Sequence, residues 1–268
     1  MANYLRAMLL GRILLLQVLC LFGGFRSAGA DSPPLPGSAP NVLLGSAVAT
    51  QVRSLDRTSR EDFLVAEILK GNVPDSWRRF VEVTVTRTNA GKVHRLTMSV
   101  APDYVTVGTD ADGWLTPLSP QAAERIAFLD SNYAYDSTKG HADRLATWLR
   151  GGTNRVLAVL AYHDSIALLN GKTFVSKAGG TWGRGHAMVQ DLGEWFALAK
   201  AEDAEWENFS GLEGRVRFLL RKNPKKEILH TRQVEWNGFI HAMAVNTAME
   251  EVGYRYFGPR AYEKWVEE

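Results

Sequence analysis

The second half of the chain holds the residues best suited to chemistry. His163 and Asp164 lie just after residues 155–161, an apolar run typical of a buried strand. Open α/β sheets place ligands and catalytic groups at the carboxyl ends of their strands, so a histidine oriented by a carboxylate here could act as a general base or metal ligand. A lone histidine held by structural hydrogen bonds is the alternative interpretation.

A glycine-rich segment, residues 179–186, is the other candidate. It combines four glycines with a tryptophan, an arginine and a histidine, just ahead of a predicted helix. Backbone N–H groups at the positive helix end could hold an anion there, with Arg184 binding a carboxylate or phosphate. The segment matches neither the phosphate-binding loop nor the dinucleotide fingerprint, and a flexible surface loop is the alternative. The candidate catalytic residues are therefore His163, Asp164 and His186, and the candidate ligand-binding residues are Trp182, Gly183 and Arg184.

Other chemistries have weaker support. His230 and His241 lie on separate predicted elements and match no compact zinc spacing, although histidines from separate elements could still converge. The turn from Asp110 to Gly113 begins like a calcium loop, but residues 116–120 supply no acidic ligand. We therefore assign no metal, and no motif identifies a cofactor. No Gly-x-Ser-x-Gly nucleophile elbow is present.

The first thirty residues have the pattern of a secretory signal peptide. Arg6 and Arg12 precede an apolar run at 13–22, which is shorter than the roughly 20 residues of a membrane-spanning helix. Cleavage after Ala30 removes three arginines and no acidic residue, which changes the formal net charge from +2 to −1. The one cysteine, Cys20, leaves as well, so the mature chain has neither a thiol nucleophile nor a disulfide. We expect a secreted or periplasmic protein that binds no nucleic acid and keeps no stable membrane span.

The elements expected before residue 131 form a small α+β unit. After a proline-rich linker, residues 31–45, a helix is predicted over 60–70 with Ser59 as its N-cap. Alternating residues predict a β-hairpin, and two shorter strands should follow it. Ser119 and Pro120 are typical of a helix start. The predicted ranges are 80–87 and 93–100 for the hairpin, 104–107 and 114–115 for the short strands, and 119–130 for the second helix.

The second half, residues 131–268, is predicted to be mostly helical with one or two buried strands. It should pack as one globule with the residue 46–130 unit. The fold class expected is thus α+β, with an N-terminal helix and a small antiparallel sheet followed by this helical half. The predicted helices span 141–150, 162–169, 186–202, 211–222 and 232–252.

Residues 60–127 resemble a family of uncharacterised secreted bacterial proteins. The resemblance rests on four short runs in order, Glu67–Pro74, Pro102–Tyr104, Gly108–Asp112 and Pro117–Pro120. It implies export and a bacterial origin, and it carries no known activity. His163-Asp164 is a candidate counterpart of a His-Asn pair of the family, whose later histidine-containing stretches are absent here.

Two functions fit these observations. The first is an exported hydrolase that acts on a cell-envelope glycan or peptide through histidine and carboxylate chemistry. The second is a non-catalytic envelope module that binds a glycan or protein partner, in which several of the eight tryptophans would be exposed rather than buried. An enzyme should gather histidine and carboxylate side chains in one place, whereas a binding module should leave them scattered.

Overall fold

The computed structural model describes residues 43–73, 81–89, 91–100, 104–108, 113–117, 119–230 and 238–250. The predicted signal peptide and most of the proline-rich linker lie outside these residues. No helix within the described ranges is long and apolar enough to cross a membrane.

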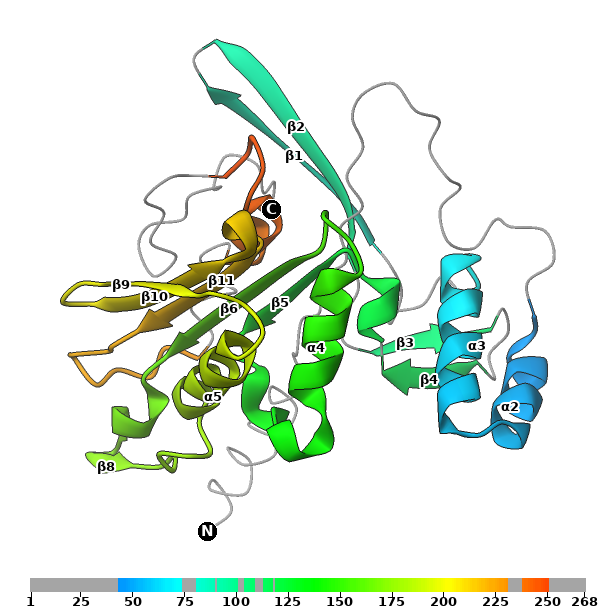
Figure 1. Ribbon diagram of the computed structural model, residues 1–268, viewed down its shortest axis with the longest axis horizontal. Coiled ribbons are helices and arrows are strands. Elements are labelled where there is room, and N and C mark those ends of the chain that lie inside the picture. Colours follow the sequence, from blue (N-terminus) through cyan, green and yellow to red (C-terminus); the bar gives the residue numbers. More distant parts are fainter. Residues whose placement is uncertain are drawn as a thin grey trace.

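Two helices and two hairpins form the N-terminal part (Figure 1). The helices are α2 (Gly45–Ser54) and α3 (Arg57–Leu69), and the antiparallel hairpins pair β1 (Val81–Asn89) with β2 (Lys92–Val100) and β3 (Tyr104–Val107) with β4 (Trp114–Pro117). The predicted strands are confirmed. The helix expected at 60–70 begins earlier, because Asp56 rather than Ser59 caps it by accepting the N–H groups of Thr58 and Ser59.

The helix predicted over 119–130 does not form. Ser119 caps only a single 3₁₀ turn, and the chain then enters the strand β5 (Arg125–Leu129). After β5 come α4 (His141–Arg150) and β6 (Val156–Tyr162), both close to their predicted bounds. The 3₁₀ turns are η1 (Pro120–Ala122), η2 (Asn132–Ala134), η3 (Ser137–Lys139), η4 (Asp164–Ile166) and η5 (Leu212–Gly214).

The prediction of a mostly helical second half is wrong. A five-stranded mixed sheet with the order β5-β6-β11-β10-β9 occupies it. The strands β9 (Ala199–Glu202) and β11 (Val216–Arg221) lie where helices were expected at 186–202 and 211–222, and β10 (Trp206–Gly211) falls mostly between those two ranges. Besides α4, the helices among the described residues of this half are α5 (Thr181–Gly193) and α7 (Gly238–Ala244). In place of a helix at 162–169 there is a 3₁₀ turn followed by the hairpin of β7 (Leu168–Leu169) and β8 (Lys172–Thr173).

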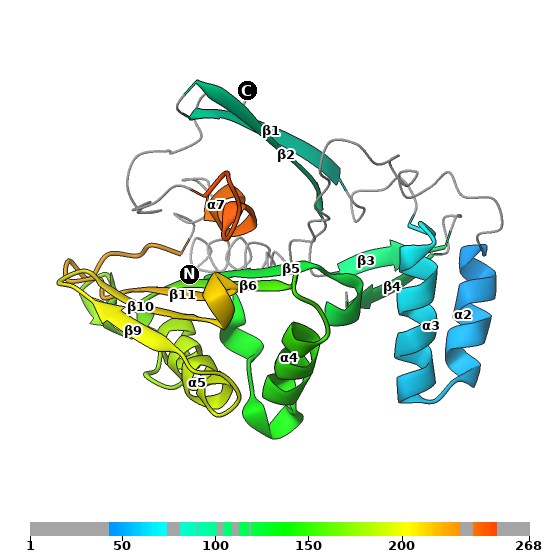
Figure 2. The ribbon, with the colours of Figure 1, turned by 45° about the horizontal axis from the view of Figure 1, so that its top comes forward.

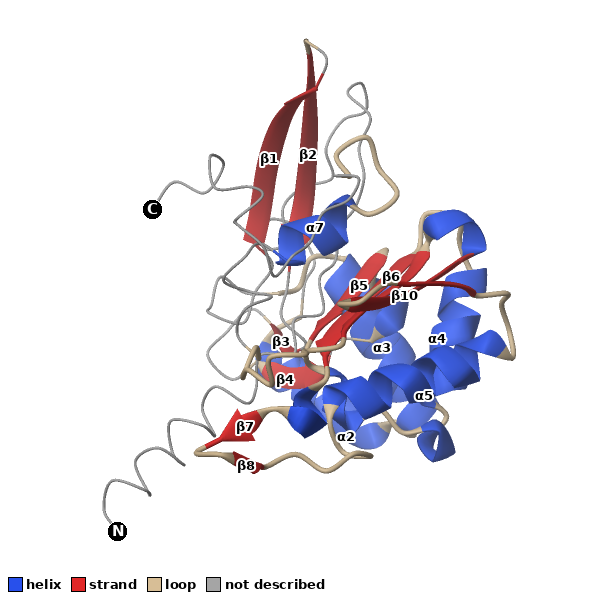
Figure 3. Ribbon diagram, turned by 90° about the vertical axis from the view of Figure 1, so that its left-hand side faces the viewer, coloured by secondary structure: helices blue, strands red, loops and turns tan. Residues whose placement is uncertain are grey.

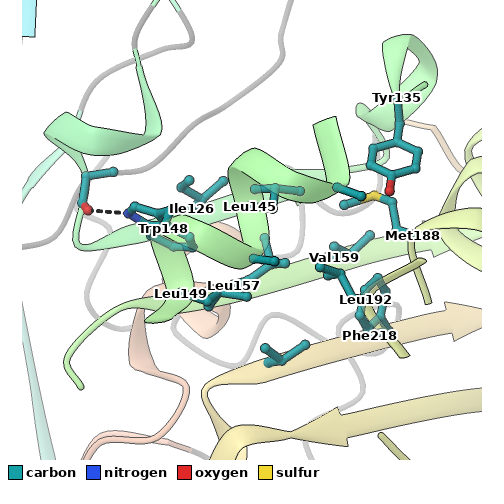
Figure 4. Packing of buried hydrophobic residues seen from close by; sticks show 14 of the residues in the cluster. Ile126, Tyr135, Leu145, Trp148, Leu149, Leu157, Val159, Met188, Leu192 and Phe218 are labelled. Atoms are coloured by element: carbon teal, nitrogen blue, oxygen red, sulfur yellow. Dashed lines mark hydrogen bonds between the residues drawn. The ribbon is translucent and has the colours of Figure 1, made fainter. Parts of the chain in front are cut away.

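Helices cover both faces of this sheet. Figure 2 shows α4 and α5 on one face and α7 on the other, which is why β6 is buried along its whole length. On the α4–α5 side, aliphatic and aromatic side chains interlock between the helices and the strands (Figure 4). Trp148 belongs to this core, and its Nε1 donates to the carbonyl of Ala123 at 2.8 Å.

Three of the five strands are parallel and end at the same edge of the sheet. β6 pairs in parallel with both β5 and β11. The residues just beyond these strands are Asp130 after β5, His163 and Asp164 after β6, and Asn223 after β11. Asn223 links the residues after β11 to those after β6, because its Nδ2 donates to the carbonyls of His163 at 3.3 Å and Glu227 at 2.9 Å.

Candidate functional site

Two buried carboxylates lie at the carboxyl edge of the parallel strands. Asp130 is 0% exposed and Asp164 is 2% exposed. Burial raises the pKa of both carboxyl groups, because the charged form loses its hydration. Asp130 also has a φ of 51°, in the left-handed region that L residues seldom adopt, and such backbone conformations cluster at functional sites.

Asp130 forms a dyad with His230, which follows β11. Its Oδ2 accepts from Nδ1 of the imidazole at 2.6 Å. This contact raises the pKa of His230, although partial burial opposes the effect. The side chain of His230 is 33% exposed, so the imidazole is accessible while its carboxylate partner is not. Tyr133 borders the dyad, with its hydroxyl 3.0 Å from the same Nδ1 atom.

Thr181, the first residue of α5, links the two carboxylates. Its hydroxyl donates to Oδ1 of Asp130 and lies 3.3 Å from Oδ2 of Asp164. Its N–H donates to the same Oδ2 atom at 2.7 Å, and the N–H of Trp182 lies 3.5 Å from Oδ1. Asp164 therefore satisfies the N–H groups at the start of α5, where negative charge is favoured. Gly180 allows this approach, because a Cβ there would lie 2.6 Å from Cγ of Asp164.

A second cluster contains three of the residues singled out in the sequence. The imidazole of His163 stacks on the indole of Trp182, with 4.5 Å between ring centroids and 10° between planes. His186 contacts the same indole at 4.6 Å, and its Nε2 lies 3.2 Å from Oε2 of Glu207. Burial lowers the pKa of His163. Because Trp182 follows Thr181 directly, this cluster adjoins the carboxylate pair.

The predicted site residues thus fall into different roles. His163 and His186 meet on Trp182, while Asp164 turns inward to the start of α5. Gly183 and Arg184 lie within the first turn of α5 rather than in a loop ahead of a helix, because the helix begins at Thr181. Among the N–H groups expected to hold an external anion, those of Thr181 and Trp182 face Asp164, and that of Arg184 donates to the carbonyl of Gly180.

Within the described part of the chain, no group of three or more His, Cys, Asp and Glu residues is placed to hold a metal ion. His230 is held by Asp130, and His241 lies in α7 with only 5% of its surface exposed. Burial and the positive charge of Arg217 lower the pKa of His241 to about 4. The turn that begins like a calcium loop includes positions outside the described residues.

Sequence reasoning missed most of the dyad. It placed Asp130 at the end of a helix, gave Tyr133 and Thr181 no role, and considered His230 only as one of several scattered histidines. One signal for a strand that ends at a carboxylate was available in the sequence. The apolar run Ile126–Leu129 ends directly before Asp130, in the same way that the apolar run 155–161 ends shortly before Asp164. No family model, curated protein or solved structure matches this chain.

Proposed function

We propose that this chain is a hydrolase in which His230 is the general base and Asp130 orients it. The observation that carries the proposal is the 2.6 Å contact between a fully buried carboxylate and a partly exposed imidazole at the carboxyl edge of parallel strands. A carboxylate in this position fixes the ring and stabilises the imidazolium that forms during proton transfer.

In the proposed reaction, His230 takes a proton from a water molecule as its oxygen attacks the substrate. The imidazolium, stabilised by Asp130, then returns the proton to the leaving group, so the enzyme ends in its starting state. Tyr133 and Thr181 hold the dyad in place through their hydroxyl groups. Asp164 is a positioning residue, because it anchors the start of α5 and thereby the hydroxyl of Thr181.

The neighbouring aromatic cluster is proposed to bind substrate. His163, Trp182 and His186 bring an indole and two imidazoles together next to Asp164 and Thr181 in the chain, and Glu207 and Lys200 add charge, with 3.3 Å between Lys200 Nζ and Glu207 Oε2. Such a mixture of aromatic and charged groups suits a polar polymer more than an apolar small molecule. With the predicted export signal, this supports a cell-envelope glycan or peptide as substrate.

The alternative of a non-catalytic binding module has less support. It requires scattered polar groups and exposed tryptophans, whereas Trp148 and Trp206 are buried at 2% and 4% exposure and Trp182 is covered by imidazoles. Trp195 is 40% exposed, but the guanidinium of Arg150 lies 4.4 Å over its ring.

The test is turnover of purified peptidoglycan and of chromogenic esters, peptides and glycosides by the wild type and by His230→Gln. Removing a general base should lower kcat/KM by about 10²–10⁴-fold. His141→Gln is the matched control and should leave turnover unchanged. His141 is the first residue of α4, and its imidazole accepts the N–H of Asp136. The wild-type kcat/KM should rise with pH as His230 loses its proton. This rise should be centred above pH 6.5, because Asp130 raises the pKa of His230.

Two results would overturn the proposal. One is the absence of wild-type turnover on every substrate class. The other is a wild-type rate retained by His230→Gln. The proposed export is checked separately, by measuring the mass of the native polypeptide, which should begin at Asp31.

A further inference from the structure

The β7–β8 hairpin has an unusual composition for an exposed element. It lies between the carboxyl end of β6 and the start of α5, at the margin of the described part of the molecule (Figure 3). Asn170 and Gly171 form its turn with φ angles of 53° and 77°, as in the tight type I′ turn favoured by Asn-Gly. The hairpin is therefore a narrow, well-defined tip.

Large apolar side chains are exposed on this tip. Leu169 is 51% exposed and Phe174 is 50% exposed, and Leu168 and Ile228 are also exposed. These four residues, which we name the hairpin patch, are four of the ten exposed large hydrophobics of the described chain. Ile228 belongs to the segment after β11. This segment is bonded to the hairpin, because the N–H of Leu168 donates to the carbonyl of Lys226 at 3.0 Å.

The hairpin patch is apolar on both faces of the hairpin. Leu168 and Leu169 are successive residues of one strand, so their side chains point to opposite faces. A protein partner seated on one face would leave the other exposed to water. A lipid layer surrounds an inserted tip from all sides, which makes it the environment that fits this arrangement.

Positive charge surrounds the hairpin patch. Lys172, Lys177, Lys225 and Lys226 flank it, and residues 168–177 and 224–229 contain a single acidic residue, Glu227. Within the described ranges, these four lysines make no ion pair. By contrast, Lys200 in β9 and Lys222, which follows β11, are both paired with Glu202. A mature chain of near-neutral net charge thus carries a local cluster of cations around exposed apolar residues.

We propose that the hairpin patch docks on the surface of an anionic lipid bilayer. The leucine and phenylalanine side chains enter the boundary between headgroups and acyl chains, and the lysines contact anionic headgroups. The docking needs neither the dyad nor its activity. It would turn the carboxyl edge of the sheet toward the membrane, because the hairpin follows β6 and the lysine-bearing segment follows β11.

Co-sedimentation of the full chain with vesicles tests this proposal. The vesicles are phosphatidylcholine alone or with a quarter of phosphatidylglycerol, at low and high salt. The wild type should prefer the anionic vesicles, and salt should weaken the preference. The double variant Lys225→Glu and Lys226→Glu should lose binding by at least about 25-fold, from about fivefold for each lysine near an anionic surface. Leu169→Ser with Phe174→Ser should lose binding to both vesicle types.

The controls change exposed residues of the same kinds elsewhere. Val93→Ser with Leu115→Ser replaces two exposed apolar residues of β2 and β4, and Lys92→Glu reverses an exposed charge. These variants should bind as the wild type does, and the predicted leader is common to all of them. Three results would overturn the proposal. The control variants could lose vesicle binding as strongly as the hairpin variants do, or binding could persist in Leu169→Ser with Phe174→Ser. The third result is a wild-type dimer in solution that this pair of substitutions dissociates.

Discussion

His241 should make the fold sensitive to acid. Its imidazole lies in α7 against β5, 5% exposed, and burial together with the charge of Arg217 lowers its pKa from 6.5 to about 4. The folded-state pKa is below the unfolded one, so the stability that neutral His241 contributes is complete above pH 6.5 and is lost as the pH falls toward 4. At about 1.4 kcal/mol per pKa unit, the loss amounts to about 3 kcal/mol.

His241→Gln removes this titration while keeping a polar side chain of similar size. Urea unfolding at pH 7 and pH 4 should show that the wild type loses about 3 kcal/mol more stability between these values than the variant does. The buried carboxyls of Asp130 and Asp164 act in the opposite sense, because their pKa values are raised, but they are present in both proteins and cancel in the comparison. Equal losses in the two proteins would refute the reasoning.

Two further predictions concern the carboxyl edge of the sheet. Gly180→Ala places a Cβ against the carboxylate of Asp164 and should lower the free energy of unfolding in urea by about 1–3 kcal/mol. At Gly193 a Cβ meets nothing within 4 Å, so Gly193→Ala should stabilise α5 by about 0.5–1 kcal/mol. Equal effects at the two glycines would contradict the packing described. Asp130→Asn should lower the pKa of His230, because the hydrogen bond to the carboxylate is what raises it, and an NMR titration of the imidazole should move to lower pH. An unmoved titration would show that Asp130 does not control His230.

The elements that were predicted correctly have a regular local pattern. The β1–β2 hairpin shows strict alternation on both sides of a short polar turn, and α4 begins after one glycine, Gly140, and ends before another, Gly151. The buried strand β6 is a continuous apolar run. In each case the local signal and the tertiary environment favour the same structure.

The missed strands show where local signals fail. β11 was assigned to a helix although its burial alternates, with Val216, Phe218 and Leu220 inside, which is a strand period that the sequence does display. The burial of β9 shows no such period, because its four residues are all exposed at the edge of the sheet. β5 was lost because the cap at Ser119 and the short apolar run after it fit a helix as well as a strand.

The candidate site was less accessible to sequence reasoning than the fold. His163, Trp182 and His186 were singled out, and the structure brings them together. Asp130 and His230 are 100 residues apart, and only the parallel pairing of β5, β6 and β11 makes them neighbours. The Asn170-Gly171 turn was also overlooked, although this dipeptide is among the strongest hairpin signals.

The strand order of the sheet has a consequence for when the dyad forms. β5, α4 and β6 are consecutive in the chain and can associate early, because closing short loops costs little entropy. β11 joins β6 only after α5, β9 and β10 have been made, and His230 lies beyond β11. A nascent polypeptide that has placed only its first two parallel strands therefore has Asp130 but not its imidazole partner, so any activity of the pair begins only after β11 has joined the sheet and His230 has followed it.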